Sequence, residues 1–269
     1  MNSKNKSVKE ISNTPFEHGA PMDVAGTMVE NKPSQTYVTI RFYTKVAPKM
    51  LFSIKNADTK DKNKFVIGVD WFDTKLAPLF NAIRNDDPFA DQMLLDIENG
   101  IETLGDMYKS KQENIRNLIS SNLKMASSSI EFPDNGHTSE CKVSFNNRLA
   151  YSFLWLTKEL DNYMYYLHLA DKFNVINRET YNDEWSDAKR AFRRTLGLIN
   201  AWKPTSITRV DLAQNTARVA IAFGINERVN LSQEVLFLQN RASTAPAIND
   251  WKNGIINDEI LSMLKNNFT

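Results

Sequence analysis

Hydrophobic residues recur at helical spacing on both sides of a short polar segment at residues 85–91. Before this segment, five apolar residues fall on one face of a helix: Trp71, Leu76, Leu79, Phe80 and Ile83. After it, six more do the same: Phe89, Met93, Leu94, Ile97, Ile101 and Leu104. Pro88 disfavours the helical conformation at Asp87 and has no amide hydrogen to leave unpaired, so we predict Asp87 as an N-cap and Pro88 as the first residue of a new helix. Each helix has one apolar stripe to bury, which predicts a helical core.

Residues 37–45 (YVTIRFYTK) alternate strictly between apolar and polar positions, which is typical of a β-strand. The inner side would carry Val38, Ile40 and Phe42, and the outer side Tyr37, Thr39, Arg41 and Tyr43. A lone strand leaves backbone amides and carbonyls unpaired, so this strand needs a partner. Three partners fit the sequence: residues 49–54, residues 65–69, or the same strand from a second subunit.

Helical periodicity fills most of the remaining chain. The helix that begins at Pro88 is expected to continue to about residue 124, with another helix packed closely over Gly100 and Gly105. Other predicted elements are a short strand at residues 142–145, helices at residues 147–173, 178–202 and 208–224, a short helix from Ser232, and a last helix at residues 258–265. The fold class is therefore predicted to be mainly α, a helical domain with a small β-ribbon near the N-terminus.

The same pattern divides the chain into three parts. Residues 1–35 lack sustained periodicity and are expected to form a flexible N-terminal arm. This arm is either an unstructured leader or a basic segment that follows a DNA groove. Residues 36–250 are expected to form a single mainly helical domain, and residues 251–269 a C-terminal tail helix.

The composition is that of a globular, helix-rich protein, with 42% hydrophobic and 24% charged residues. The formal net charge of +1 hides an uneven distribution. Residues 41–66 hold seven Lys or Arg against two Asp, whereas residues 86–113 hold eight carboxylates against two Lys. The single cysteine, Cys141, excludes an intramolecular disulfide framework. No apolar run reaches the ~18 residues that span a bilayer, and the polar start MNSKNKSVKE has no signal-peptide core, so we expect a cytoplasmic protein without a membrane partner.

The search for catalytic chemistry is largely negative. The three histidines do not have the spacing of metal ligands, and the few isolated glycines form no nucleotide-binding loop or nucleophile elbow. Three carboxylates invite an interpretation as the Mg²⁺ ligands of a nuclease: Asp86, Asp87 and Asp91. Helix capping and the helix dipole account for the same residues without a metal. We therefore predict no enzymatic activity, no cofactor and no metal.

Two basic features remain as candidate binding surfaces. The outer side of the strand at residues 37–45 combines hydrogen-bond donors with aromatic rings, as a β-ribbon does when it reads base edges in the major groove. The alternative is the solvated face of an ordinary sheet. The second feature is a cluster at helical spacing that is suited to phosphates: Lys189, Arg190, Arg193 and Arg194. For this cluster we favour a solvated helix flank or internal ion pairs with the acidic segment at residues 86–113.

Several short stretches, taken in order, resemble the AcaB-like family of transcriptional regulators found on conjugative plasmids and integrating conjugative elements. They are residues 85–91 followed by Leu94-Leu95 and Ile97-Glu98; Phe145-Asn146-Asn147 with Ala150-Tyr151; Arg190-Ala191-Phe192; Thr208-Arg209 with Thr216-Ala217-Arg218; and Ala245-Pro246-Ala247-Ile248. No single stretch is specific for this family, but their occurrence in the family's order from about residue 37 to 248 is specific.

The resemblance implies a homodimeric activator of conjugative transfer genes that binds double-stranded promoter DNA in the bacterial cytoplasm. It also implies a ribbon-helix-helix-like module, here at about residues 36–124, in which one strand from each of two subunits pairs into a ribbon. Either residues 37–45 or residues 65–69 would supply that strand. The expected DNA contacts are Thr39, Arg41, Tyr43 and Lys45 on the strand, Lys49 and Lys55 on phosphates, and Arg190, Arg193 and Arg194 as a second basic surface. The alternative is a helical protein-protein interaction component of the conjugation apparatus that does not bind DNA.

Overall fold

The break at residue 87 separates two helices, α2 (Val69–Arg84) and α3 (Pro88–Met125), as the sequence predicts. Asp87 caps α3, because its Oδ1 accepts hydrogen bonds from the backbone amides of Phe89 at 2.9 Å and Ala90 at 3.1 Å. The preceding residue, Asp86, has a φ of 66°, a left-handed conformation that lets the chain reverse between the two helices. The predicted N-cap and the predicted first helical residue are therefore confirmed.

The computed structural model describes residues 36–55, 65–125 and 139–268. Residues 37–269 form one compact unit. The arm predicted at residues 1–35 lies outside the described residues.

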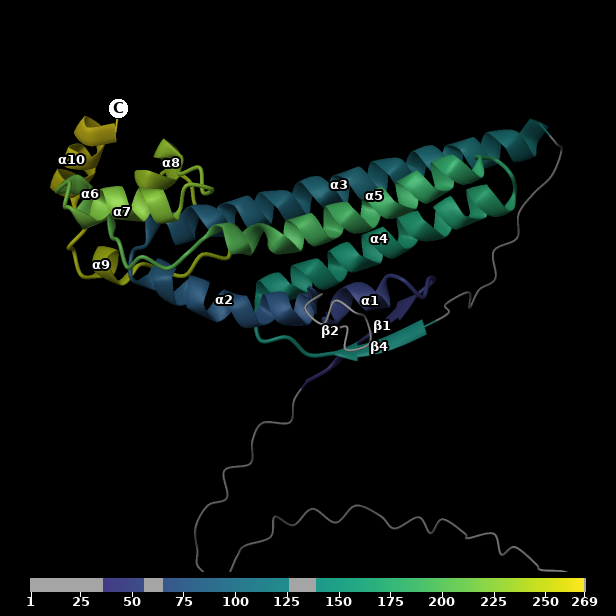
Figure 1. The fold of residues 1–269 in the computed structure, drawn as a ribbon, viewed down its shortest axis with the longest axis horizontal. Coiled ribbons are helices and arrows are strands. Elements are labelled where there is room, and N and C mark those ends of the chain that lie inside the picture. The colour runs from purple at the N-terminus through teal and green to yellow at the C-terminus, as the bar shows by residue number, and fades with distance from the viewer. Residues whose placement is uncertain (1–35, 56–64, 126–138, 269) are drawn as a thin grey trace, which may run out of the picture. The chain divides into compact units, whose positions relative to one another are not determined.

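Three long helices run side by side along most of their length: α3, α4 (Arg148–Lys172) and α5 (Arg178–Gly197) (Figure 1). The 3₁₀-helix η1 (Leu198–Ala201) continues α5 and packs on α3 at Gly100. A Cβ atom added to Gly100 would lie 3.1 Å from the Leu198 side chain and 3.2 Å from that of Thr195, which confirms the expected close approach there. At Gly105 the nearest side-chain atom, on Leu156, would be 3.7 Å away, so that glycine is not required for packing.

The strand predicted at residues 37–45 is β1 (Val38–Phe42), and it pairs antiparallel with β4 (Ser139–Val143) of the same chain. Neither partner proposed from within the chain is correct. Pro48 begins a helical turn, α1 (Pro48–Leu51), which buries Met50 and Leu51, so residues 49–54 are not a strand. The next two short strands, β2 (Ile54–Lys55) and β3 (Phe65–Val66), pair with each other instead.

The C-terminal part consists of short helices gathered around the first turns of α3 (Figure 1). They are α6 (Arg209–Ala213), α7 (Arg218–Ile225), α8 (Gln233–Leu236), α9 (Asn249–Lys252) and α10 (Asp258–Phe268). The single helix predicted at residues 208–224 is wrong, because Asn215 takes a φ of 48° and ends α6. The predicted fold class, mainly α with a small antiparallel sheet near the N-terminus, is confirmed.

Candidate nucleic-acid interface

The two-stranded sheet β1–β4 presents a polar outer face. Ile40 and Phe42 of β1 are buried, whereas Thr39 and Arg41, which alternate with them, are exposed. In the antiparallel register, Thr39 lies opposite Lys142 and Arg41 lies opposite Glu140, and both residues of β4 are also exposed. The predicted alternation along this strand is therefore confirmed from Val38 to Phe42.

Helix α4 holds the end of β1 in place. The Asp161 carboxylate is fully buried and accepts hydrogen bonds from the backbone amides of Tyr43 at 2.7 Å and Thr44 at 2.9 Å. Lys158, one helical turn earlier, donates its Nζ to the carbonyl oxygen of Arg41 at 2.8 Å and lies 3.2 Å from the Asp161 carboxylate. The ribbon is thus fixed to a core helix through its backbone, which leaves the side chains of its outer face available for contacts.

The charges on this face are only partly neutralised. Arg41 Nε donates to Glu140 Oε2 at 2.9 Å, and both side chains remain largely exposed, at 66% and 46%. Lys142, Lys45 and Lys49 are exposed and form no ion pair with any residue that the structure describes. We call these four cations the ribbon surface: Arg41 and Lys142 on the outer face of the two strands, and Lys45 and Lys49 in the residues that follow β1.

Two of the predicted DNA contacts belong to residues outside the β1–β4 sheet. Tyr43 follows the end of the strand, and its ring stacks on Tyr165 of α4 with 4.7 Å between ring centroids. Lys158 Nζ lies 4.4 Å from the centroid of the Tyr43 ring, so this tyrosine packs toward α4. Lys55 lies in β2, which is paired with β3. Of the residues expected on the outer face, Thr39 and Arg41 occupy it.

Lys142 of the ribbon surface was not among the residues expected from the sequence. It lies directly opposite Thr39, on the strand whose pairing with β1 the local pattern does not reveal. The signal that would have identified it is the weak alternation in SECKV, where Glu140 and Lys142 are exposed and Val143 is buried. Recognising the partner strand is therefore what adds this cation to the surface.

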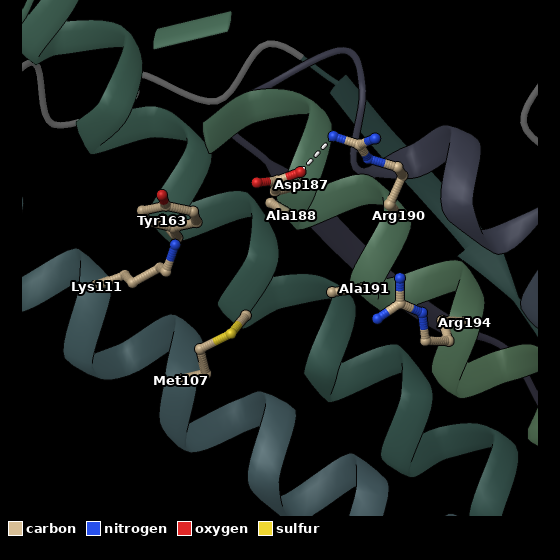
Figure 2. A pocket seen from close by; sticks show the side chains of 8 residues that line it. All are labelled: Met107, Lys111, Tyr163, Asp187, Ala188, Arg190, Ala191 and Arg194. Carbon is tan, nitrogen blue, oxygen red and sulfur yellow. Dashed lines mark hydrogen bonds and ion pairs between the residues drawn. The ribbon is translucent and has the colours of Figure 1, made fainter. Parts of the chain in front are cut away.

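The basic cluster on α5 divides between two sides of the helix. Arg190 and Arg194, one turn apart, line a cavity of about 450 Å³ that also contacts α3 and α4 (Figure 2). Arg190 forms an ion pair with Asp187 of its own helix. Lys189 and Arg193 are half-buried, and burial together with the charge of Arg193 lowers the pKa of Lys189. The basic cluster therefore lies on α5, whereas the ribbon is formed by the strands β1 and β4.

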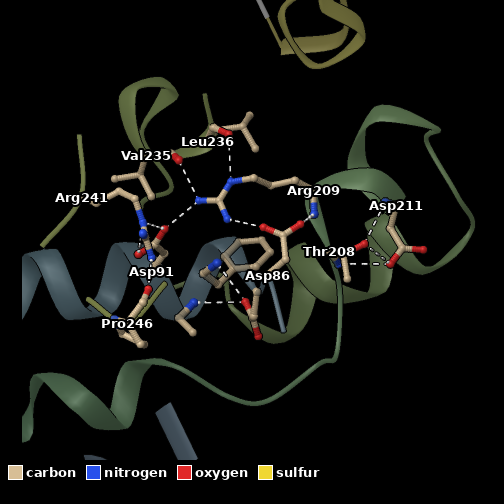
Figure 3. A network of polar contacts seen from close by, with 12 residues as sticks. Asp86, Asp91, Thr208, Arg209, Asp211, Val235, Leu236, Arg241 and Pro246 are labelled. Carbon is tan, nitrogen blue, oxygen red and sulfur yellow. Dashed lines mark hydrogen bonds and ion pairs between the residues drawn. The ribbon is translucent and has the colours of Figure 1, made fainter. Parts of the chain in front are cut away.

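The three aspartates around residue 87 are buried in a polar network rather than aligned around a metal site (Figure 3). Arg209, which is fully buried, donates its Nη1 to Asp86 at 2.6 Å and its Nη2 to Asp91 at 2.9 Å. Arg241 adds a second ion pair to Asp91 at 2.8 Å. Within the described ranges, no group of three or more His, Cys, Asp or Glu residues is arranged to hold a metal ion.

The remaining polar groups of Arg209 are also satisfied. Its Nε donates to the carbonyl of Leu236 at 3.0 Å and its Nη2 to that of Val235 at 2.8 Å, while its backbone amide donates to Asp86 at 2.8 Å. Burial raises the pKa of Asp86, and the charge of Arg209 opposes that shift. Burial likewise raises the pKa of Asp87 to about 6. The network joins α3 to α6 and α8, so its role is structural.

Acidic residues from the segment at residues 86–113 therefore find cationic partners, but not in the α5 cluster. The partners of Asp86 and Asp91 are Arg209 and Arg241, which sequence reasoning did not single out as ion-pair residues. Thr208 caps α6 through a capping box with Asp211, so this local motif makes Arg209 the first residue of the helix. The burial of Arg209 follows from the tertiary fold alone.

A further buried carboxylate, that of Asp73, ties α2 to the start of α4. Asp73 Oδ2 accepts from the Asn146 amide at 2.9 Å, and Asp73 Oδ1 accepts from the Asn147 amide at 3.1 Å and from the Asn147 side chain at 2.8 Å. A carboxylate at a helix N-terminus is favourably placed with respect to the helix dipole. These contacts give the Phe145-Asn146-Asn147 stretch a structural role.

A family model described as Transcriptional regulator AcaB matches residues 33–249 of the chain. No curated protein matches, and no solved structure matches. None of the helices within the described ranges is long and apolar enough to cross a membrane.

Proposed function

Because the chain belongs to the AcaB family of transcriptional regulators, we propose that it regulates transcription by binding double-stranded DNA through the ribbon surface. The observation that carries this proposal is the antiparallel β1–β4 pair, whose backbone is fixed to α4 and whose outer face bears Arg41 and Lys142. A two-stranded β-ribbon fits the major groove, where Arg and Lys donate to guanine acceptors. Lys45 and Lys49, just beyond the strand, are placed to contact phosphates.

In this proposal the ribbon comes from one chain. A ribbon-helix-helix arrangement with one strand from each of two subunits would need β1 or β3 to pair across a two-fold axis. Each of these strands is already paired along one edge within its own chain, β1 with β4 and β3 with β2. We therefore propose that each subunit of a homodimer brings a complete ribbon, so that two ribbons contact two half-sites. The sedimentation of the protein with and without operator DNA measures that stoichiometry.

The biological setting is proposed from the family. We propose that the protein activates conjugative transfer genes of a plasmid or integrative element in the bacterial cytoplasm, without itself acting as an enzyme. Transcription from a transfer promoter in a reconstituted system should rise when the protein is added. Transcription that is unchanged or lower would contradict activation while leaving DNA binding untouched.

The first test is DNA binding by variants of the ribbon surface. Replacing Arg41 and Lys142 by Ala removes two exposed cations and should weaken binding to a transfer-promoter fragment by at least about tenfold. The same variant should also lose preference for the promoter over random DNA, because its base contacts are gone. Replacing Lys45 and Lys49 by Ala should instead lower the slope of log affinity against log salt by about two, because two fewer counterions are released. Replacing Lys109 and Arg116 by Ala is the matched control, since both are exposed on α3 and form no ion pair with a described residue.

A second variant tests the same surface in the opposite direction. Glu140 neutralises Arg41 and repels phosphates, so Glu140→Gln should strengthen DNA binding and leave stability within about 1 kcal/mol, as expected for an exposed ion pair. The same substitution at Glu113, exposed on α3, should have no effect on binding. Weaker binding by Glu140→Gln would contradict the orientation of the ribbon toward DNA.

The outcomes separate the competing functions. Full binding after loss of Arg41 and Lys142 would move the DNA site to Arg190, Arg193 and Arg194 or to residues 1–35. Absence of binding at low salt, with promoter and random DNA alike, would favour a protein-protein interaction component of the conjugation apparatus.

A further inference from the structure

The cavity between α3, α4 and α5 has the size and lining of a small-molecule site. Its volume of about 450 Å³ falls within the range of ligand pockets, roughly 300–1,000 Å³. Met107 of α3 and Ala188 and Ala191 of α5 give it an apolar wall (Figure 2). The ring of Tyr163, from α4, is almost completely buried beside them. An apolar molecular body therefore has a surface to pack against.

The charged part of the lining is mostly cationic. Arg190 and Arg194 of α5 and Lys111 of α3 contribute three positive groups, against the single carboxylate of Asp187 in the lining. Lys111 is committed to an ion pair with Glu184, and Arg190 to one with Asp187. Arg194 is exposed and has no ion-pair partner among the described residues.

The spacing of the two arginines adds to this argument. Arg190 and Arg194 are four residues apart on α5, so both line the cavity from the same side of that helix. A bound anion would give Arg194 the charge-assisted partner that it lacks and would share Arg190 with Asp187. The same guanidinium groups are suited to carboxylate, sulfonate and phosphate alike.

We propose that this cavity binds a small organic anion, with its negative group held by Arg190 and Arg194 and its apolar body against Met107, Ala188 and Ala191. The binding concerns a free small molecule and does not depend on DNA binding by the ribbon surface. The site lies on three core helices, so it is present in the folded protein without rearrangement of a loop.

The test uses a matched pair of probes, 1-anilinonaphthalene-8-sulfonate and N-phenyl-1-naphthylamine, which share the aromatic body and differ by the sulfonate. Titration of the intact protein, followed by fluorescence and by calorimetry, should show one saturable site for the sulfonate. The neutral probe should bind at least about tenfold more weakly, as expected when charge-assisted hydrogen bonds to the anion are lost. Equal affinity for the two probes would overturn the anion site.

Two variants locate the site. Arg194→Gln should lower the affinity for the sulfonate probe by about tenfold or more, whereas Arg116→Gln, at an exposed position on α3, should leave it unchanged. Both arginines are exposed, so neither change is expected to unfold the protein, and thermal unfolding checks this. Sulfonate binding that is absent, or equal in the two variants, would overturn the proposal. A loss of DNA affinity in Arg194→Gln without a change in sulfonate binding would also overturn it, and would assign the arginines to DNA phosphates.

Discussion

Replacing Arg209 by Met is the most informative perturbation of the fold. The methionine side chain fills much of the same space but removes the guanidinium, which bonds Asp86, Asp91 and two backbone carbonyls. Asp91 keeps its ion pair with Arg241. Asp86 keeps only the backbone amide of residue 209, so its charge stays buried without a cation.

The expected cost is large. Removing one partner of a buried ion pair typically destabilises a protein by about 3–5 kcal/mol, because the remaining charge has lost its solvent and its partner. The carbonyls of Val235 and Leu236 also lose a donor. Typical domains are stable by about 5–15 kcal/mol, so Arg209→Met should remove a large share of the stability.

A double-mutant cycle identifies the cause. Asp86→Asn removes the charge and tolerates the left-handed backbone at this position, since Asn adopts it readily. The double variant should therefore be more stable than Arg209→Met alone, with a coupling energy of about 2 kcal/mol. Urea unfolding followed by tryptophan fluorescence measures all four proteins.

Arg218→Met is the matched control for this cycle. Arg218 is 55% exposed and lies 3.6 Å from Asp211, so its loss should cost about 1 kcal/mol or less. The reasoning would be refuted if Arg209→Met were no worse than Arg218→Met. It would also be refuted if Asp86→Asn gave no rescue.

Three further predictions concern the cap of α3, one glycine and the anchor of the ribbon. Burial raises the pKa of Asp87 to about 6, so the folded state binds the proton of this carboxyl more tightly than the unfolded state does. The resulting contribution to the free energy of unfolding, up to about 3 kcal/mol, is present below pH 4 and is lost as the pH rises through 6. Asp87→Asn should flatten the fall in stability over that range, and an unchanged slope in pH-dependent unfolding would contradict the prediction. A Cβ on Gly68 would lie 2.4 Å from the backbone carbonyl carbon of Phe52, so Gly68→Ala should destabilise the protein by about 1–3 kcal/mol, as measured by thermal unfolding. Gly224→Ala is the control, because there is open space around Gly224. Equal stability of the two variants would contradict the close contact at Gly68. Asp161→Ala should speed hydrogen exchange at the Tyr43 amide, which loses its acceptor, and should weaken DNA binding because β1 is held less firmly on α4. A Tyr43 amide that stays protected from exchange in this variant would show that other contacts hold the strand in place.

Much of the helical fold follows from local sequence. The effect of Pro88 and of the periodic apolar residues on helix formation depends on neighbours only a few positions away. The break between α2 and α3 can therefore be predicted from the sequence. The alternation in β1 likewise predicts the exposure of Thr39 and Arg41. The rule fails at Tyr43 because the strand ends at Phe42, after which the chain turns toward Asp161.

The remaining features depend on contacts between distant parts of the chain. The partner of β1 begins at Ser139, and the ion pair that joins the two strands spans 99 residues. Nothing in the five residues of β4 specifies that pairing. Arg209 follows a recognisable N-cap, but its burial depends on Asp86, which is 123 residues away. The left-handed residue Asn215 interrupts an apolar pattern that otherwise remains helical.

The contacts at the start of α3 also bear on the order in which the chain folds during synthesis. Asp91 bonds a residue 150 positions later, Gln92 one 140 positions later, and Glu98 one 145 positions later. These side chains emerge from the ribosome well before their partners exist, and contacts of such long separation form slowly. These polar side chains therefore lack their partners until the segment from Arg209 to Ser243 has been made, so this end of the helix completes its packing only when the chain is nearly finished.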